Sequence, residues 1–134
     1  MCRMALGVVA AEGGDVAAVQ EQYAALEAME RVPRVWWEIH CPGRLLGVMA
    51  HRIGAPEKAA AHFEEALAFT RRAGYRPELA WTCCDTADLL LDRRGPGDRE
   101  RAMALLDEGL ALSRELGMKP LIERILSRRK ILRA

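Results

Sequence analysis

The sequence lacks the features that mark several classes of protein. No apolar run approaches the roughly 18 residues that a membrane-spanning helix needs. The 20 basic and 19 acidic residues leave a formal net charge of +1, so the overall charge favours neither nucleic acid nor an anionic membrane as a partner. Outside residues 37–41, no segment alternates apolar and polar residues over five or more positions, as a half-buried β-strand would. We therefore expect an all-α protein with no nucleic-acid or membrane partner.

Signatures of catalysis and of metal binding are also missing. The spacing of the cysteines suits neither a disulfide framework nor a zinc site, which favours the reducing cytoplasm; they are Cys2, Cys41, Cys83 and Cys84. On one predicted helix, His40 and His51 lie about 16 Å apart, too far to share a metal ion. Nucleophile-elbow, phosphate-loop and dinucleotide-binding motifs do not occur. We expect no catalytic residues, no enzyme activity, no metal and no cofactor.

What the sequence does contain is internal repetition. Leu6, Gly7, Ala10, Gly14, Val19, Tyr23 and Leu26 recur forty residues later as Leu46, Gly47, Ala50, Gly54, Ala59, Phe63 and Ala66. A third and more divergent copy follows, in which an insertion around Gly95-Pro96-Gly97 lengthens the shift to forty-three residues. Self-similarity at such a period is typical of stacked helical or strand units that bury their apolar faces against their neighbours.

Helix breakers divide the chain into seven predicted helices, at about 2–12, 16–30, 35–53, 56–73, 77–94, 99–116 and 120–132. Asp15 and Asp98 are the predicted N-caps of the second and sixth helices, and Gly117 is the predicted left-handed residue after the sixth. Pro42-Gly43 should kink or break the third helix, whereas the fifth should run straight.

The fourth predicted helix has the clearest apolar stripe. Ala59, Phe63 and Ala66 lie on one side of it, and the charged residues lie mostly elsewhere. The small alanines would let a partner helix approach closely, and the ring of Phe63 would fill the gap between them. We expect this helix to pair with the one before it.

The second copy of the repeat, Leu46, Gly47, Ala50, Gly54, Ala59, Phe63 and Ala66, resembles the tetratricopeptide repeat. The period exceeds the standard length of about thirty-four residues, so each helix would be longer by about one turn. Segments 63–68, 96–102 and 115–118 are similar to the C-terminal helical arrays of large bacterial ATP-dependent regulators and of some nucleotide cyclases. The chain contains no phosphate-binding loop, cyclase or DNA-binding segment, so those activities do not transfer.

The resemblance implies a right-handed α-solenoid of about three antiparallel helix pairs plus a C-terminal capping helix. We expect one domain over residues 1–134, with repeats at about 1–33, 34–75 and 76–118 and the capping helix at 119–134. The resemblance also implies protein–protein interaction, in bacterial signalling or transcriptional regulation, through a concave groove lined by the first helix of each pair. The implied groove residues are Arg44, Val48, His51, Arg52, Trp81, Cys84, Asp88 and Asp92.

In such a groove two arginines would oppose two aspartates, and Trp81 would anchor a peptide of mixed charge. A face of ordinary solvated charges is the alternative. Cys83 and Cys84 point about 100° apart on a helix, so we expect one in the core and the other facing the groove. A clamp for a C-terminal carboxylate, another use of the family, needs asparagine, and the chain has none.

The sequence leaves three further questions open. A small-molecule sensor, the alternative function, would hold its ligand between repeats near Trp81, Cys84, His51 and Arg44. Apolar side chains on the first predicted helix would be covered by further repeats or by a second copy in a homodimer. The basic and apolar helix at 120–132 could bind nucleic acid or membrane, but we interpret it as a solvating cap on the last repeat.

Overall fold

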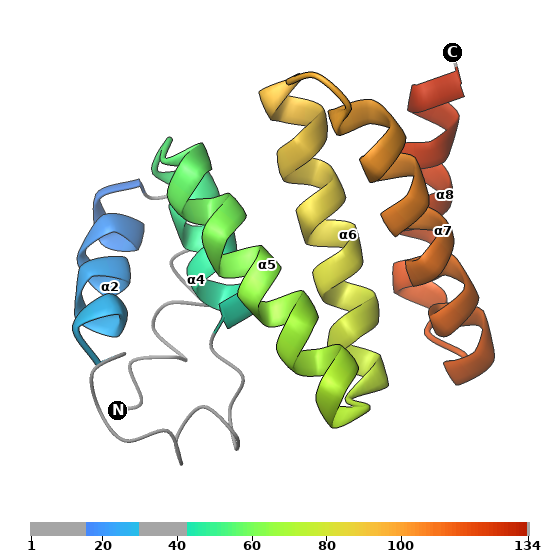
Figure 1. The fold of residues 1–134 in the computed structure, drawn as a ribbon, viewed down its shortest axis with the longest axis horizontal. Coiled ribbons are helices and arrows are strands. Elements are labelled where there is room, and N and C mark those ends of the chain that lie inside the picture. The colour runs from blue at the N-terminus through green and yellow to red at the C-terminus, as the bar shows by residue number, and fades with distance from the viewer. Residues whose placement is uncertain (1–15, 30–42, 134) are drawn as a thin grey trace. The chain divides into compact units, whose positions relative to one another are not determined.

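Helices make up all of the regular secondary structure in residues 16–29 and 43–133, the parts of the chain that the computed structural model describes. In chain order they are α2 (Val16–Met29), α4 (Gly43–Arg52), α5 (Pro56–Ala73), α6 (Arg76–Arg93), α7 (Asp98–Leu116) and α8 (Lys119–Arg133), as Figure 1 shows. The predicted all-α class is confirmed for these residues. The right-handed solenoid stays a prediction.

The helix boundaries follow the proline signals in the sequence. Pro56 opens α5, and Pro77 and Pro120 lie in the first turns of α6 and α8, where the missing N–H has no intrahelical acceptor to lose. The ends of α5 match the prediction, those of α6, α7 and α8 differ from it by at most one residue, and α6 runs without a break as predicted. The first predicted helix, the capping role of Asp15 and the break at Pro42 lie outside the described residues.

Gly117 ends α7 in the conformation that the sequence predicts. Its φ is +69°, in the left-handed region that a residue without Cβ adopts at little cost. The N–H of Gly117 donates to the carbonyl oxygen of Arg114 at 3.3 Å, and the N–H of Met118 donates to that of Ser113 at 2.8 Å. These bonds satisfy two carbonyl groups at the end of α7 and turn the chain toward α8.

The predicted role of Asp98 is wrong. Residue 97, a left-handed glycine, is the N-cap of α7, and Asp98 is the first helical residue and makes no side-chain capping bond. Its carboxylate instead accepts two hydrogen bonds from Arg93, both at 2.8 Å, and one from the N–H of Gly95 at 2.8 Å. The guanidinium of Arg93, at the end of α6, offers a stronger two-point partner than the helix N–H groups do. The hydrogen bonds from Arg93 lower the pKa of Asp98 to about 2.

The chain divides into two compact units, Met1–Ala66 and Leu67–Ala134, and the boundary falls inside α5. The second unit contains the C-terminal end of α5 together with α6, α7 and α8. A single domain over residues 1–134 stays a prediction.

In the first unit two glycines of α4 lie against α5. A Cβ atom at Gly47 would stand 2.6 Å from Cδ1 of Phe63, and one at Gly43 would stand 3.1 Å from Cβ of Ala66. Phe63 is fully buried, and so is Ala59. The prediction that small residues admit a partner helix and that Phe63 fills the gap is therefore confirmed.

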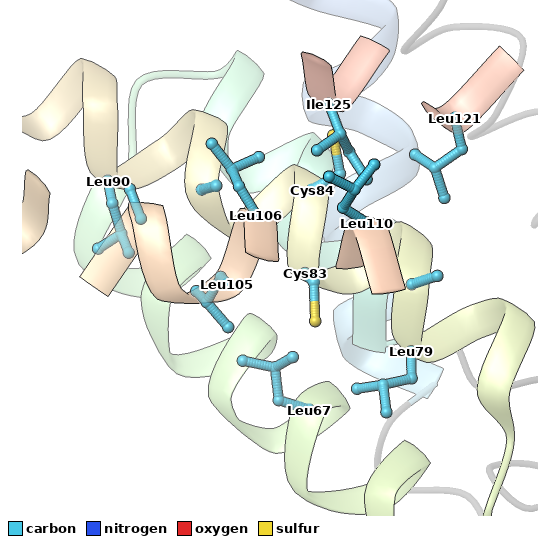
Figure 2. Close-up of a cluster of buried hydrophobic side chains, with 13 residues drawn as sticks. Leu67, Leu79, Cys83, Cys84, Leu90, Leu105, Leu106, Leu110, Leu121 and Ile125 are labelled. Atoms are coloured by element: carbon cyan, nitrogen blue, oxygen red, sulfur yellow. The ribbon is translucent and has the colours of Figure 1, made fainter. Parts of the chain in front are cut away.

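The second unit is built around one hydrophobic core. Helix α7 packs along α6, and α8 packs along α7. The core side chains, drawn in Figure 2, are Leu67, Leu79, Ala80, Cys83, Cys84, Ala87, Leu90, Ala102, Leu105, Leu106, Leu110, Leu121 and Ile125. Gly109 of α7 lies between two neighbours, because a Cβ there would be 3.3 Å from both Cys83 Cβ and Ile125 Cδ1. Helix α8 is thus part of this core, through Leu121 and Ile125.

Candidate protein-binding surface

One stripe of α6 carries polar and aromatic side chains on a single side of the helix. Trp81, Asp85, Asp88 and Asp92 follow one another at intervals of four, three and four residues, which is the spacing of one helix face. Trp81 and Asp88 are half-buried, and Asp92 is exposed. This stripe, together with Arg124, Arg128 and Ile131 of α8, is named here the α6–α8 face.

Two arginines of α8 bind the aspartates of α6. Nη2 of Arg124 donates to Oδ1 of Asp85 at 3.0 Å and to Oδ2 of Asp88 at 2.7 Å. Nε of Arg128 donates to Oδ1 of Asp88 at 2.8 Å. Both oxygens of Asp88 are therefore engaged, and two guanidinium groups neutralise two carboxylates across the helix pair.

The bonds of Arg124 and Arg128 to Asp85 and Asp88 are named here the ionic ladder. The burial of these side chains decides how much the ladder contributes to the stability of the fold. The side chain of Asp85 exposes 7% of its area, that of Asp88 18% and that of Arg124 35%. A carboxylate buried to this extent has lost most of its hydration, which only a hydrogen-bonded cation replaces. Removing one partner should therefore cost much more than the net contribution of the intact pair. The ladder holds α8 in one position against α6.

Apolar groups accompany the ladder on the α6–α8 face. The guanidinium carbon of Arg124 lies 6.0 Å from the ring centroid of Trp81, at the limit of a cation–π contact. Ile131 follows Arg124 by seven residues and Arg128 by three, so it lies on the same side of α8, and it is 64% exposed. Tryptophan and arginine are among the residues enriched in the cores of protein interfaces.

Cys84 lies beneath this face and not on it. Cys83 and Cys84 are both fully buried, and in Figure 2 their side chains leave α6 in different directions. The expectation that one of them faces the groove is therefore wrong. The sequence could not show that α8 covers this side of α6 with Ile125. Burial, the larger cause, raises the pKa of each thiol to about 12, so neither is a reactive thiolate at neutral pH.

The other predicted groove residues belong to the first unit. Arg44, Val48, His51 and Arg52 lie on α4, spaced as one helix face, and none of them is fully buried. The side of α4 that packs inward carries Leu46, Gly47 and Ala50 instead. The structure therefore places the four predicted residues on the more exposed side of α4. Their joint groove with Trp81, Asp88 and Asp92 stays a prediction.

Sequence reasoning missed four residues of the face, namely Asp85, Arg124, Arg128 and Ile131. The sequence alone predicts that the cations of α8 belong to a solvating cap, and it does not distinguish Asp85 from its neighbours. A signal was present in the spacing: two acidic residues three apart on α6 match two arginines four apart on α8. Such a match becomes informative only when the two helices are known to be adjacent.

A second group of polar side chains, Tyr23, His62 and Glu27, lies in the first unit. Oη of Tyr23 and Nε2 of His62 are 2.9 Å apart, and both side chains are buried. Oη of Tyr23 also lies 3.4 Å from Oε1 of Glu27. Within residues 16–29 and 43–133 no group of three His, Cys, Asp or Glu side chains could hold a metal ion.

Comparison with known proteins finds no matching family model, no matching curated protein and no matching solved structure. None of the described helices has the length and apolar character needed to cross a bilayer.

Proposed function

We propose that the chain is a protein-binding module of the tetratricopeptide type, and that the α6–α8 face contacts a peptide or the surface of a partner protein. One observation carries the proposal. The bonds of Arg124 to Asp85 and Asp88 join two helices into one surface on which an aromatic ring and an exposed isoleucine are displayed together.

The chemistry of the face indicates what kind of segment it takes. Trp81 offers a ring of which part is accessible, and Ile131 offers an apolar contact. Asp92 is exposed at one end of the stripe and adds a negative charge to this part of the face. A peptide with one apolar anchor and mixed charge meets these requirements.

Packing in the first unit supports the resemblance behind this proposal. The close approach of Gly47 to Phe63 joins the two positions that carry the Leu-Gly and Phe signals of the repeat. On this basis we propose a place in bacterial signalling or transcriptional regulation, in the cytoplasm. Arg44, Val48, His51 and Arg52 of α4 are proposed as further contact residues of the same module.

The test is affinity purification of the tagged chain from cells that produce it, with mass spectrometry of the bound proteins. Trp81→Ala and Asp92→Arg should each lose a partner that the unaltered chain retains. Tyr75→Ala is the matched control, because Tyr75 is 53% exposed but precedes α6 and lies off the stripe. Calorimetry with the recovered partner should show at least about tenfold weaker binding for the two face variants. Retention of every partner by both variants would contradict the proposal.

A further inference from the structure

A second surface of α8 lies on a different side of the helix from the α6–α8 face. Leu126, Arg129, Lys130 and Arg133 are spaced at i, i+3, i+4 and i+7, which is one helix face, and they line a surface hollow of about 480 Å³. Arg124 and Leu126 are two residues apart and therefore about 200° apart around the helix. These four residues are named here the outer face of α8.

The outer face carries two cations that no acidic side chain of the described residues neutralises. Helix α8 holds six basic residues and one acidic residue. Arg124 and Arg128 bind the aspartates of α6, and Arg129 pairs with Asp107 at 3.1 Å. No carboxylate in the described part of the chain forms an ion pair with Lys130 or Arg133, and both side chains are exposed.

The hollow also has an apolar group and an unsatisfied donor. Leu126, which lines it, is 41% exposed although it is a large hydrophobic side chain. Arg129 lines it as well, and its Nε is buried without a hydrogen-bond acceptor among the residues described. Leu126 is therefore the apolar group of the hollow that a partner can contact, whereas the buried Nε is out of its reach.

We infer that the outer face of α8 binds an amphipathic helix of a partner protein, with an apolar side chain of that helix over Leu126 and its acidic side chains on Lys130 and Arg133. The hollow receives the apolar side chain, and the uncompensated cations select the acidic flanks. This interface is separate from the α6–α8 face and does not rest on the proposed function of that face.

Two other polyanionic partners fit the same residues less well. A helix that binds a membrane surface lays its apolar side in the lipid, but the apolar side of α8, with Leu121 and Ile125, is buried in the core of the second unit. Two uncompensated cations release few counterions on binding nucleic acid, and the net charge of +1 adds no long-range attraction. An acidic helix needs only a local match of charge and shape.

The experiment uses the full chain and two fluorescein-labelled helical peptides of about 16 residues, which differ only in carrying Glu or Lys beside a leucine stripe. Fluorescence anisotropy should show saturable binding of the Glu peptide. Lys130→Glu/Arg133→Glu should weaken that binding at least about tenfold and transfer the preference to the Lys peptide. Arg72→Glu/Arg114→Glu, exposed on α5 and α7, makes the same charge change elsewhere and should leave binding unaltered. Leu126→Ala should weaken binding of the Glu peptide.

Several results would overturn the inference. Equal binding of the Glu and Lys peptides would remove the charge selection. If the outer-face variant and the Arg72/Arg114 control lose the same affinity for the Glu peptide, the binding depends on net charge and not on the outer face. Tighter binding of vesicles that contain phosphatidylserine, or of a single-stranded RNA, with the same dependence on Lys130 and Arg133, would assign the face to that partner instead. Trp81→Ala should change none of these values, so this test and that of the α6–α8 face fail independently.

Discussion

The ring of Phe63 lies directly against the backbone of Gly47, so a Cβ atom added at residue 47 would stand 2.6 Å from both Cδ1 and Cε1 of the ring. Phe63 is fully buried, so the ring cannot move aside without disturbing its neighbours. This pair therefore sets how closely α4 and α5 approach each other in the first unit.

Gly47→Ala should lower the free energy of unfolding by about 1–3 kcal/mol through overpacking, although alanine is the better helix former. Phe63→Ala should lower it by about 3–5 kcal/mol because the ring leaves a cavity. In the Phe63→Ala background the clash is gone, so Gly47→Ala should become neutral or stabilising. Chemical denaturation of the four proteins in this cycle measures the change of sign. Additive losses would mean that the two residues do not meet.

The ionic ladder predicts strong coupling between Asp85 and Arg124. Arg124→Ala should cost about 1.5–3 kcal/mol, because it removes charge-assisted hydrogen bonds from two largely buried carboxylates. Asp85→Ala should lower the free energy of unfolding less in the Arg124→Ala variant than in the unaltered chain. The difference between the two losses, which is the coupling energy, should be about 1–2 kcal/mol.

The pair of Arg71 and Glu108 is the matched control for this cycle. Its closest nitrogen and oxygen are 2.7 Å apart, but its side chains are 47% and 35% exposed. A coupling below about 1 kcal/mol is expected there. A larger coupling at the exposed pair than at the ladder would contradict the argument from burial.

Asp98 predicts a pH dependence of stability in the acid range. Its pKa in the folded chain, about 2, lies below that of an aspartate in an unfolded chain, mainly through the hydrogen bonds from Arg93. Its contribution is therefore complete above about pH 5 and is lost as the pH falls toward 2. Urea unfolding between these pH values should show the stability difference between the unaltered chain and Asp98→Asn narrowing. In an Arg93→Gln background this stability difference should change less between pH 5 and pH 2. If it changes as much as in the unaltered chain, the pH dependence arises from another group.

The two buried thiols of α6 should resist alkylation. With each pKa raised to about 12 by burial, Cys83 and Cys84 should react with iodoacetamide at pH 8 at least about a hundredfold more slowly in the native chain than in urea. Mass spectrometry of the peptide that contains both residues counts the labels. Rapid addition of a single label would show that one thiol faces solvent.

The helices of this chain could largely be predicted from local signals. Pro56 and Gly117 act within a turn of their own position, so α5 and the end of α7 could be located without any tertiary information. Asp98 shows where local reasoning fails. The usual role of an aspartate at that position is to cap a helix, but Arg93 lies close enough to compete for it, and a bidentate guanidinium is the stronger partner.

The candidate site was harder to predict, because its residues come from helices that are separate in the sequence. Trp81, Asp88 and Asp92 could be assigned to one stripe of α6 from spacing alone. The sequence does not show that Arg124 and Arg128 neutralise Asp88, because this depends on α8 lying beside α6. Helix α8 also explains why Cys84 is buried. The angle of about 100° between adjacent residues on a helix could not predict this burial.

The pattern of apolar residues, prolines and glycines was enough on its own to determine the all-helical class of the described residues, the ends of most of their helices and the stripe on which Phe63 is buried. These outcomes depend on interactions within one or two helical turns. Only the tertiary structure decided which charges of α8 are neutralised, because a carboxylate and a guanidinium from distant segments meet only after the core has brought their helices together. Arg124 binds two aspartates, whereas Lys130 has no acidic partner among residues 16–29 and 43–133, and this contrast is a property of the packed helices.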